Sequence, residues 1–186
     1  ALYFENSIRK VDLPLLGSSA ARVDRIDRVA GRLVVDSKFG VGIPWSGPAK
    51  INGRVWPVAN PETLWLPPGP VAIEPSAIAP PLRILDFNGD LKTASVRTGA
   101  VEVSYNSSHR AIAVLDRLPA AVDIDGVPAA PAWVSSTGRY TLLLPKGQHV
   151  VTFLLTAPPP VKEALRSSPS AAATLLSIPR TPRPLP

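Results

Sequence analysis

The sequence predicts an all-β protein: two packed β-sandwich-like domains followed by a short helical, Pro-rich C-terminal tail. Among 186 residues there are 23 Pro and 12 Gly, and they divide the chain into short segments rich in Val, Ile and Leu. Such segments are typical of strands. Residues 101–105 alternate between apolar and polar side chains, as a strand with one solvated face requires. Hydrophobic residues make up 45% of the chain, which is too many for a disordered polypeptide.

The expected strands follow one another along the chain with Gly- or Pro-containing turns between them. Gly31 divides the first long segment into two strands. Asn88-Gly89 stands between two apolar segments and predicts a hairpin, because both residues tolerate the positive φ of a type I′ turn. Prolines before Val161 can open a helix, so we expect helix mainly within 158–178. Strands are predicted at 1–8, 21–37, 49–53, 62–66, 71–75, 82–87, 91–97, 100–106, 110–116, 120–126, 139–145 and 148–155.

Two stretches of the chain carry the same pattern. In each, a strand ends in Ile-Asn-Gly or Ile-Asp-Gly, and a later apolar strand ends in Leu-Pro-x-Gly. The Asn-Gly and Asp-Gly pairs supply the left-handed conformations of a tight turn at low cost. A repeat of this length predicts one small β domain per copy. We therefore expect domains at 1–80 and 81–157 with a tail at 158–186, and two equivalent β-hairpin turns at the Leu-Pro-x-Gly segments.

The second copy resembles the PEGA-type repeat, a bacterial extracytoplasmic β module built around V-x-I-D-G and L-x-x-G-x-H-x-V. The matching residues are Val122, Ile124, Asp125, Gly126, Leu144, Gly147, His149 and Val151. The first copy departs from this pattern, since Asn52 replaces the Asp and Val71 stands where the His would align. Residues 101–126 more loosely resemble carboxyl-terminal β-sandwich accessory modules of bacterial carbohydrate-active enzymes. These resemblances imply an extracytoplasmic location, periplasmic or cell-surface, and an accessory role.

Charge and composition disfavour several classes of partner. The net charge is +6, but the 20 Lys and Arg are scattered singly, usually near Asp or Glu as in residues 22–28. No segment combines a basic stripe with interleaved aromatic residues, so we do not expect nucleic-acid binding, although an anionic polysaccharide is compatible with the charge. No apolar run reaches the roughly 18 to 20 residues of a membrane span. The sequence begins with Ala1 and has no Met, so we expect it to be part of a longer polypeptide.

No catalytic or metal-binding motif is present in the sequence. There is no Cys, and the two histidines, His109 and His149, are expected in a polar turn and in a locally bonded strand position. Residues 86–90 open like a calcium loop, but the positions that need Gly and Glu are occupied by Leu91 and Arg97. The sequence therefore predicts no cofactor, no metal and no enzyme activity. The carboxylate pairs, which we interpret as solvated turns, are Asp24 with Asp27, Asp86 with Asp90, and Asp123 with Asp125.

The tryptophans are the one chemically distinctive group of residues. An indole can stack on a sugar ring or fill a small β core. Trp65 lies in an apolar strand and is expected in the core, whereas Trp45 and Trp56 each adjoin a Pro in a connecting segment and are our candidate ligand-binding residues. The sequence thus favours a non-catalytic accessory or interaction module of a larger exported bacterial protein. Its expected partner is a polysaccharide or a neighbouring domain of the same polypeptide. The alternatives are a glycoside hydrolase fragment with its catalytic domain upstream, and a structural spacer.

Overall fold

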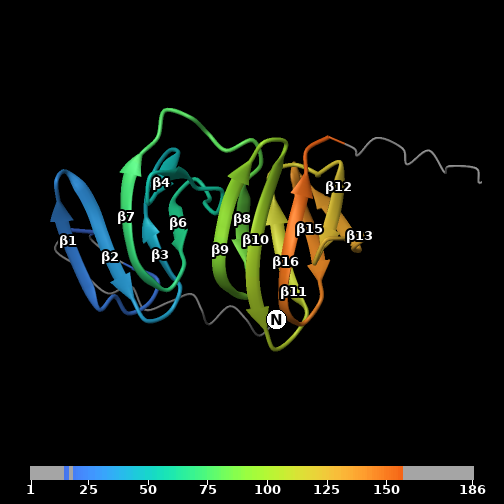
Figure 1. Ribbon diagram of the computed structural model, residues 1–186, viewed down its shortest axis with the longest axis horizontal. Helices are drawn as coiled ribbons and strands as arrows, with labels where there is room; N and C mark the ends of the chain where they lie inside the picture. Colours follow the sequence, from blue (N-terminus) through green and yellow to red (C-terminus); the bar gives the residue numbers. More distant parts are fainter. Residues whose placement is uncertain (1–14, 17–18, 157–186) are drawn as a thin grey trace, which may run out of the picture.

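Every regular element in the described residues is a β-strand, which confirms the predicted all-β class (Figure 1). The computed structural model describes residues 15–16 and 19–156. The strands predicted at 1–8 and the helix predicted within 158–178 lie outside these residues. The strands are β1 (Arg25–Val29), β2 (Arg32–Ser37), β3 (Val41–Pro44), β4 (Ala49–Ile51), β5 (Arg54–Val55), β6 (Thr63–Leu66), β7 (Gly69–Pro75), β8 (Ile84–Phe87), β9 (Asp90–Arg97), β10 (Ala100–Ser107), β11 (Ala111–Leu115), β12 (Ala121–Ile124), β13 (Val127–Ala129), β14 (Trp133–Ser136), β15 (Arg139–Leu144) and β16 (Gly147–Leu154).

The first half of the chain contains a five-stranded sheet, in the order β1-β2-β7-β4-β5, and the two-stranded sheet β3-β6. All neighbouring strands are antiparallel. Alternation determines which face is buried: Leu33 pairs with Ile73 and Val35 pairs with Val71, and all four side chains are buried. Side chains of β3 and β6 are buried as well and belong to the same hydrophobic cluster.

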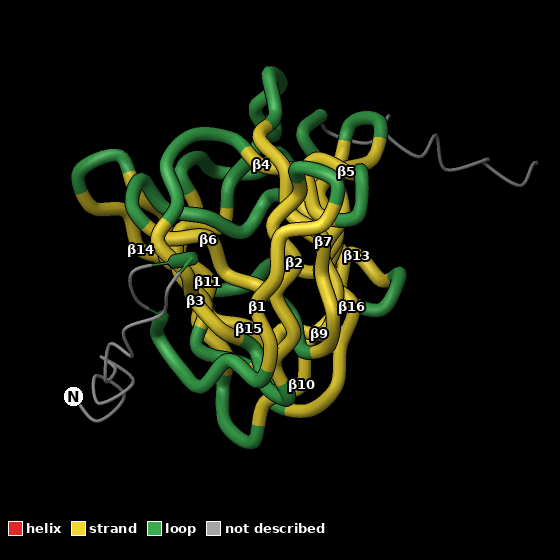
Figure 2. The backbone as a smooth tube through the Cα atoms, turned by 90° about the vertical axis from the view of Figure 1, so that its left-hand side faces the viewer, coloured by secondary structure: helices red, strands yellow, loops and turns green. Residues whose placement is uncertain are grey.

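The second half repeats this arrangement with additional strands. Its five-stranded sheet runs β13-β12-β16-β10-β9, so β9, β10, β16, β12 and β13 take the places of β1, β2, β7, β4 and β5. The opposing sheet is β14-β15-β11-β8, in which β11 and β15 correspond to β3 and β6. Figure 2 shows strands connected by loops throughout the described chain. The sequence repeat therefore corresponds to a structural duplication.

The Asn-Gly and Asp-Gly turns are equivalent in the two halves. Asn52 and Asp125 have φ values of 51° and 54°, and the glycine after each also has positive φ. The Oδ1 atom of Asn52 accepts the amide of Ala72 at 2.9 Å, and Oδ1 of Asp125 accepts the amide of Val150 at 2.9 Å. The side-chain amide of Asn52 ties its turn to β7, and the carboxylate of Asp125 ties the equivalent turn to β16.

The predicted hairpins at Leu-Pro-x-Gly and at Asn88-Gly89 are wrong. The Leu-Pro-x-Gly segments join β6 to β7 and β15 to β16, and in each pair the two strands belong to different sheets. Asn88-Gly89 likewise joins β8 to β9 across the sandwich, and neither residue has positive φ. Oδ1 of Asn88 accepts the amide of Ile112 in β11 at 2.6 Å. We call a segment that joins strands of opposite sheets a crossing. The Asn88 side chain therefore ties this crossing to the sheet that contains β11, and it does not close a two-residue turn.

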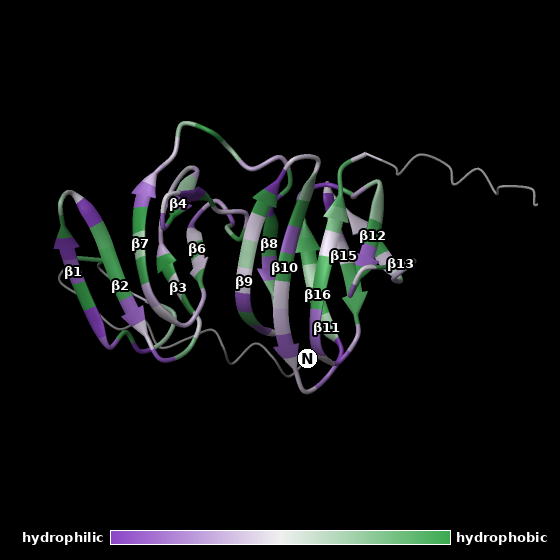
Figure 3. Cartoon of the chain, viewed as in Figure 1, coloured by the Kyte–Doolittle hydropathy of each residue, from purple (hydrophilic) through white to green (hydrophobic). Residues whose placement is uncertain are grey.

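The two halves meet through a short backbone contact and a shared core. Val58 forms a parallel bridge with Ile84, the first residue of β8. One cluster of buried hydrophobic residues includes side chains from both halves, and apolar stretches lie along the strands of both (Figure 3). The predicted boundary at residue 80 lies in the connection between β7 and β8. None of the described residues form a helix long and apolar enough to cross a membrane.

We expect Gly147→Ala to destabilise the protein more than Gly69→Ala. Both glycines have positive φ, 109° and 93°, where an L-residue costs about 1–2 kcal/mol. A Cβ on Gly147 would also lie 3.3 Å from Nε2 of His149, whereas a Cβ on Gly69 would meet nothing within 4 Å. Urea denaturation of both variants measures the difference. Equal losses in the free energy of unfolding would contradict the prediction that a Cβ at residue 147 is crowded by His149.

Candidate functional site

A shallow hollow lies beside Trp45 in the first half of the chain. Its volume is about 650 Å³ and it is lined by Pro44, Trp45, Ser46, Pro61, Glu62 and Pro75. These residues come from the end of β3, the turn before β6 and the end of β7. The wall is mainly prolyl and aromatic, while Glu62 and Ser46 carry the polar side chains. An open apolar hollow with a few polar groups can hold a ligand without excluding water from it.

Backbone hydrogen bonds fix the hollow's two walls to each other. The amide of Trp45 donates to the carbonyl of Glu62 at 3.0 Å. The turn that carries Glu62 is closed by Oδ1 of Asn60, which accepts the amides of Glu62 at 2.9 Å and Thr63 at 2.8 Å. Both walls are therefore positioned before any ligand arrives, which reduces the entropy cost of binding.

Trp45 is partly buried and packs against the core. Its indole Nε1 is buried and has no hydrogen-bond partner among the described residues. Trp45 was predicted from the sequence as a candidate ligand-binding residue, and its side chain lines the hollow. Glu62 and Ser46 were not identified from the sequence, because no motif links residue 46 to residue 62 before the β3-β6 pairing is known.

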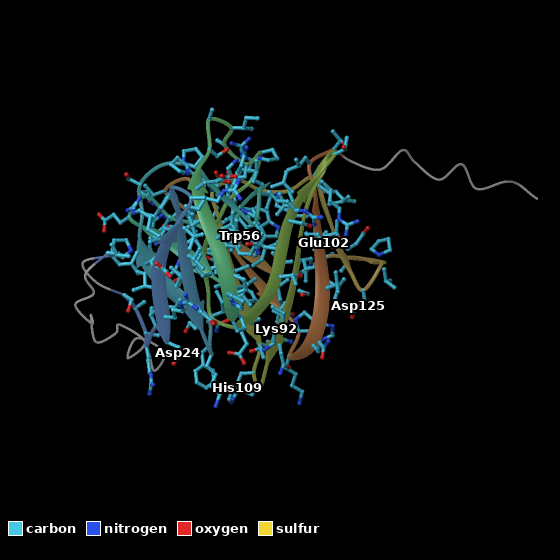
Figure 4. All side chains as sticks on the ribbon, turned by 60° about the vertical axis from the view of Figure 1, so that its left-hand side comes forward. Asp24, Trp56, Lys92, Glu102, His109 and Asp125 are labelled. Carbon is cyan, nitrogen blue, oxygen red and sulfur yellow. The ribbon has the colours of Figure 1, made fainter. Side chains whose placement is uncertain are left out.

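Trp56, the other candidate, is a core residue with 5% of its surface exposed. Its Nε1 donates to the carbonyl of Trp65 at 2.7 Å. Trp56 also reaches a small pocket of about 70 Å³, far below the roughly 300 Å³ at which ligand pockets begin. The expectation that Trp56 stacks on a sugar is therefore corrected: a neighbouring strand covers the indole and uses its only donor. Figure 4 shows Trp56 within the body of the molecule.

The remaining tryptophans have different surroundings. Trp65 packs against the core, as expected, and lies over Gly42, where a Cβ would come within 2.6 Å of the indole ring. Trp133 is 49% exposed on β14, and its ring centroid lies 6.2 Å from that of Tyr140. Trp133 could not be singled out from the sequence, because its exposure depends on β14 being the last strand of its sheet.

His149 and Asp125 form a titratable pair in the second half whose pKa values are both shifted. Nδ1 of His149 lies 2.7 Å from Oδ2 of Asp125, and Nε2 lies 2.9 Å from the carbonyl oxygen of Lys146. The hydrogen bond to Asp125, followed by the Lys146 carbonyl, raises the pKa of His149. The Val150 amide, followed by His149, lowers the pKa of Asp125. Because both ring nitrogens face acceptors, the imidazolium form is the better satisfied one.

Tyr105 lies beside this pair and completes a clamp on the Leu-Pro-Lys-Gly crossing. Its hydroxyl donates to the carbonyl of Pro145 at 2.7 Å, and its ring centroid lies 5.9 Å from that of His149. Burial, and then the negative charge of Asp125, raise the pKa of Tyr105 to about 12. The clamp is saturated with internal hydrogen bonds, so its role is to hold the crossing against the Asp125-Gly126 turn.

Several of the carboxylates singled out from the sequence bond to backbone amides or basic side chains. Asp24 accepts the amide of Lys38, Asp27 pairs with Arg25, and Asp86 accepts the amide of Phe87. Asp24 and Asp125 lie well apart on the molecule (Figure 4). Within residues 15–16 and 19–156, no three His, Cys, Asp or Glu side chains gather in a way that could hold a metal ion.

Comparison of the chain with protein-family models, curated proteins and solved structures finds no match. A functional conclusion therefore depends on the geometry of the chain itself. Among the described residues, the Trp45 hollow combines an aromatic side chain, an exposed carboxylate and a hydroxyl residue.

We expect Trp56→Ala to lower the free energy of unfolding by about 3–5 kcal/mol, because it empties a buried site. It also leaves the Trp65 carbonyl without its indole donor. Trp45→Ala, at a partly buried position, should cost clearly less. Chemical denaturation followed by circular dichroism makes the comparison. A mild effect of Trp56→Ala would contradict its assignment to the core.

The His149–Asp125 pair predicts a stability that depends on pH. The folded-state pKa of His149 lies above its ordinary 6.5, so its contribution is complete below pH 6.5 and is lost as pH rises through the folded pKa. The Asp125 contribution is present above its ordinary pKa of 3.8 and is lost as pH falls further. Denaturation midpoints should therefore decline from pH 6 to pH 9 in the native protein and in His109→Gln. In His149→Gln this decline should be reduced, and an undiminished decline would refute the assignment.

Proposed function

We propose that this chain is a non-catalytic tandem β-sandwich module that binds a glycan at the Trp45 hollow, as an accessory part of a larger exported protein. The observation that carries the proposal is the position of Trp45 on the wall of an open hollow, with Glu62 and Ser46 beside it. Sugars present apolar C–H faces and many hydroxyls. An aromatic wall with carboxylate and hydroxyl groups matches both features.

The geometry of the hollow favours weak binding of a neutral glycan. Stacking on one indole contributes about 1 kcal/mol beyond the buried area, and a shallow hollow leaves most of the ligand in water. Affinity should then be in the range of about 10 µM to 1 mM. Glu62 is the charged residue on the wall, so it would accept hydrogen bonds from neutral hydroxyls and would repel an anionic sugar at close range.

The composition of the hollow also supports a binding role over hydrolysis. Glycosidases generally use two carboxyl groups about 5–10 Å apart, and the wall of the hollow carries one, that of Glu62. Asp24, Asp27 and Asp86, identified from the sequence, bond to amides or basic groups elsewhere on the surface. The chemistry of the hollow is therefore that of recognition.

A structural spacer is the second candidate. The observation that favours it is the joint between the halves, where a parallel bridge and a shared core fix one sandwich against the next. Such a unit would hold neighbouring parts of a polypeptide at a set distance without binding a ligand.

Titration with neutral oligosaccharides distinguishes these two roles. Tryptophan fluorescence and calorimetry should report saturable binding by the native protein. Trp45→Ala should abolish the binding, and Glu62→Gln should weaken it about three- to tenfold, the loss expected when one charged acceptor is removed. Trp133→Ala is the matched control, because it removes an exposed indole outside the hollow.

Two results would overturn the glycan proposal. Binding that survives Trp45→Ala would place the ligand elsewhere, and the absence of binding across a broad neutral panel would leave the spacer role in its place. Hydrolysis of any glycan by the purified chain would contradict the non-catalytic assignment.

A further inference from the structure

The smaller sheets of the two halves join into one continuous ladder. Ala59 pairs with Leu64 of β6, and its neighbour Val58 pairs in parallel with Ile84 of β8. The ladder therefore runs from β3 through β6, residues 57–59 and β8 to β11, β15 and β14. A ladder of this kind has two ends, and each end presents backbone groups that can pair with a further strand.

The joint, formed by residues 57–59 and Ile84, shows how one half docks on the other. The amide of Ile84 donates to the carbonyl of Pro57 at 2.8 Å, and the amide of Ala59 donates to the carbonyl of Ile84 at 3.0 Å. Val58 and Ile84 are each 1% exposed. Two backbone hydrogen bonds and two buried aliphatic side chains thus join the halves at this point, and β5 of the first half also contacts β9 of the second.

Residues 131–133 occupy in the second half the position of residues 57–59 in the first. Trp133 pairs with Leu142 as Ala59 pairs with Leu64. The Ala132 carbonyl accepts the amide of Leu143 at 2.9 Å, as the Val58 carbonyl accepts the amide of Trp65 at 3.1 Å. The counterparts of the docking groups are therefore the carbonyl of Pro131 and the amide of Trp133. We call residues 131–133 the tail edge.

The tail edge is uncovered in the described part of the chain. β14 is the last strand of its sheet, and all four of its residues are exposed. Trp133 is 49% exposed, Val134 69% and Leu143, on the neighbouring strand, 37%. β14 contains no charged residue or proline, the usual devices that keep an exposed edge from pairing.

At the opposite end of the ladder, the chain bonds to β3 as it bonds to β11 in the second half. The amide of Ala20 donates to the Gly42 carbonyl at 2.7 Å, as the Asn88 amide donates to the Ile112 carbonyl at 3.3 Å. Gly42 pairs with Trp65 of β6, and Ile112 pairs with Leu143 of β15, so the two carbonyls are equivalent. Leu16 lies four residues before Ala20 and Ile84 lies four residues before Asn88.

By its position in the chain Leu16 corresponds to Ile84; it lies in a turn and packs against the core. Its neighbour Leu15 is 43% exposed. We call Leu15 and Leu16 the head segment. The chain thus places the residue that corresponds to Ile84 at one end of the ladder and an uncovered docking edge at the other.

We propose that the tail edge binds the head segment of a second copy of this chain, in parallel, and so repeats the joint between copies. Leu16 of the second copy would donate its amide to the carbonyl of Pro131 and accept the amide of Trp133. The contact is head-to-tail, so every assembly keeps one free head and one free tail, and association continues into linear assemblies. The exposed side chains of Trp133 and Val134 would be covered.

Sedimentation of single-site variants tests the contact. The native chain should associate with rising concentration over about 10 µM to 1 mM, the range of a small interface. Trp133→Pro removes the outward amide and should block the tail. Leu16→Pro should block the head in the same way. Trp133→Ala retains the amide and restores the residue found at position 59, so it should associate more strongly than Trp133→Pro. Circular dichroism verifies that each variant is folded.

Mixing the blocked variants gives the decisive result. Trp133→Pro and Leu16→Pro should each be monomeric alone, but together they should form a one-to-one heterodimer that grows no further. A native chain that is monomeric at 1 mM overturns the proposal. This holds whether the C-terminal residues of the same chain cover the tail edge or nothing covers it. Undiminished association of Trp133→Pro also overturns the proposal, as does a mixture of the two variants that stays monomeric.

Discussion

The segment from Trp56 to Trp65 holds the molecule together. The indole of Trp56 donates to the Trp65 carbonyl, and the Val58 carbonyl accepts the Trp65 amide. The same short segment pairs with β8 of the second half. The Pro57 carbonyl accepts the amide of Ile84, and the Ala59 amide donates to the carbonyl of Ile84. One turn of chain therefore closes the first sandwich, positions Glu62 beside Trp45, and joins the two halves. The position of the hollow's wall and the joint between the halves both depend on hydrogen bonds made by this segment.

The duplication shows how different side chains can serve one structural purpose. Asn52 and Asp125 both tie a left-handed turn to the next strand, the first as a neutral amide and the second as a carboxylate. The carboxylate also bonds His149, while the residue aligned with His149 in the first half, Val71, is buried in the core. The second half thus gains a titratable clamp where the first half has the neutral Asn52 amide and the buried Val71.

The two proposals concern separate parts of the molecule. The hollow belongs to the first half and involves Trp45, while the tail edge belongs to the second half and involves Trp133. An array of copies would carry one hollow per copy at regular spacing. Weak sites repeated along an array gain avidity when they engage one polymer, which is how weak glycan sites commonly become effective.

The sequence by itself determined the strand content, the repeat and the local turns. Asn52-Gly53 and Asp125-Gly126 are tight turns because few other residue pairs adopt those φ values. Alternation likewise identified the buried face of β10. Four short strands, β3, β5, β13 and β14, were not predicted, because they contain Gly or Pro or are only two to four residues long. Such segments become strands only when a partner strand supplies the hydrogen bonds.

Only the tertiary structure decided which sheet each strand joins and which tryptophan is exposed. Asn88-Gly89 and the Leu-Pro-x-Gly segments looked like hairpin turns, but their flanking strands pair with distant partners in opposite layers. Trp45 and Trp56 have the same kind of neighbours in sequence, yet one lines a hollow and the other is 5% exposed. The physical reason is the same in both cases. Periodicity specifies which face of a strand is apolar, whereas layer and exposure depend on segments far away in the chain that cover it.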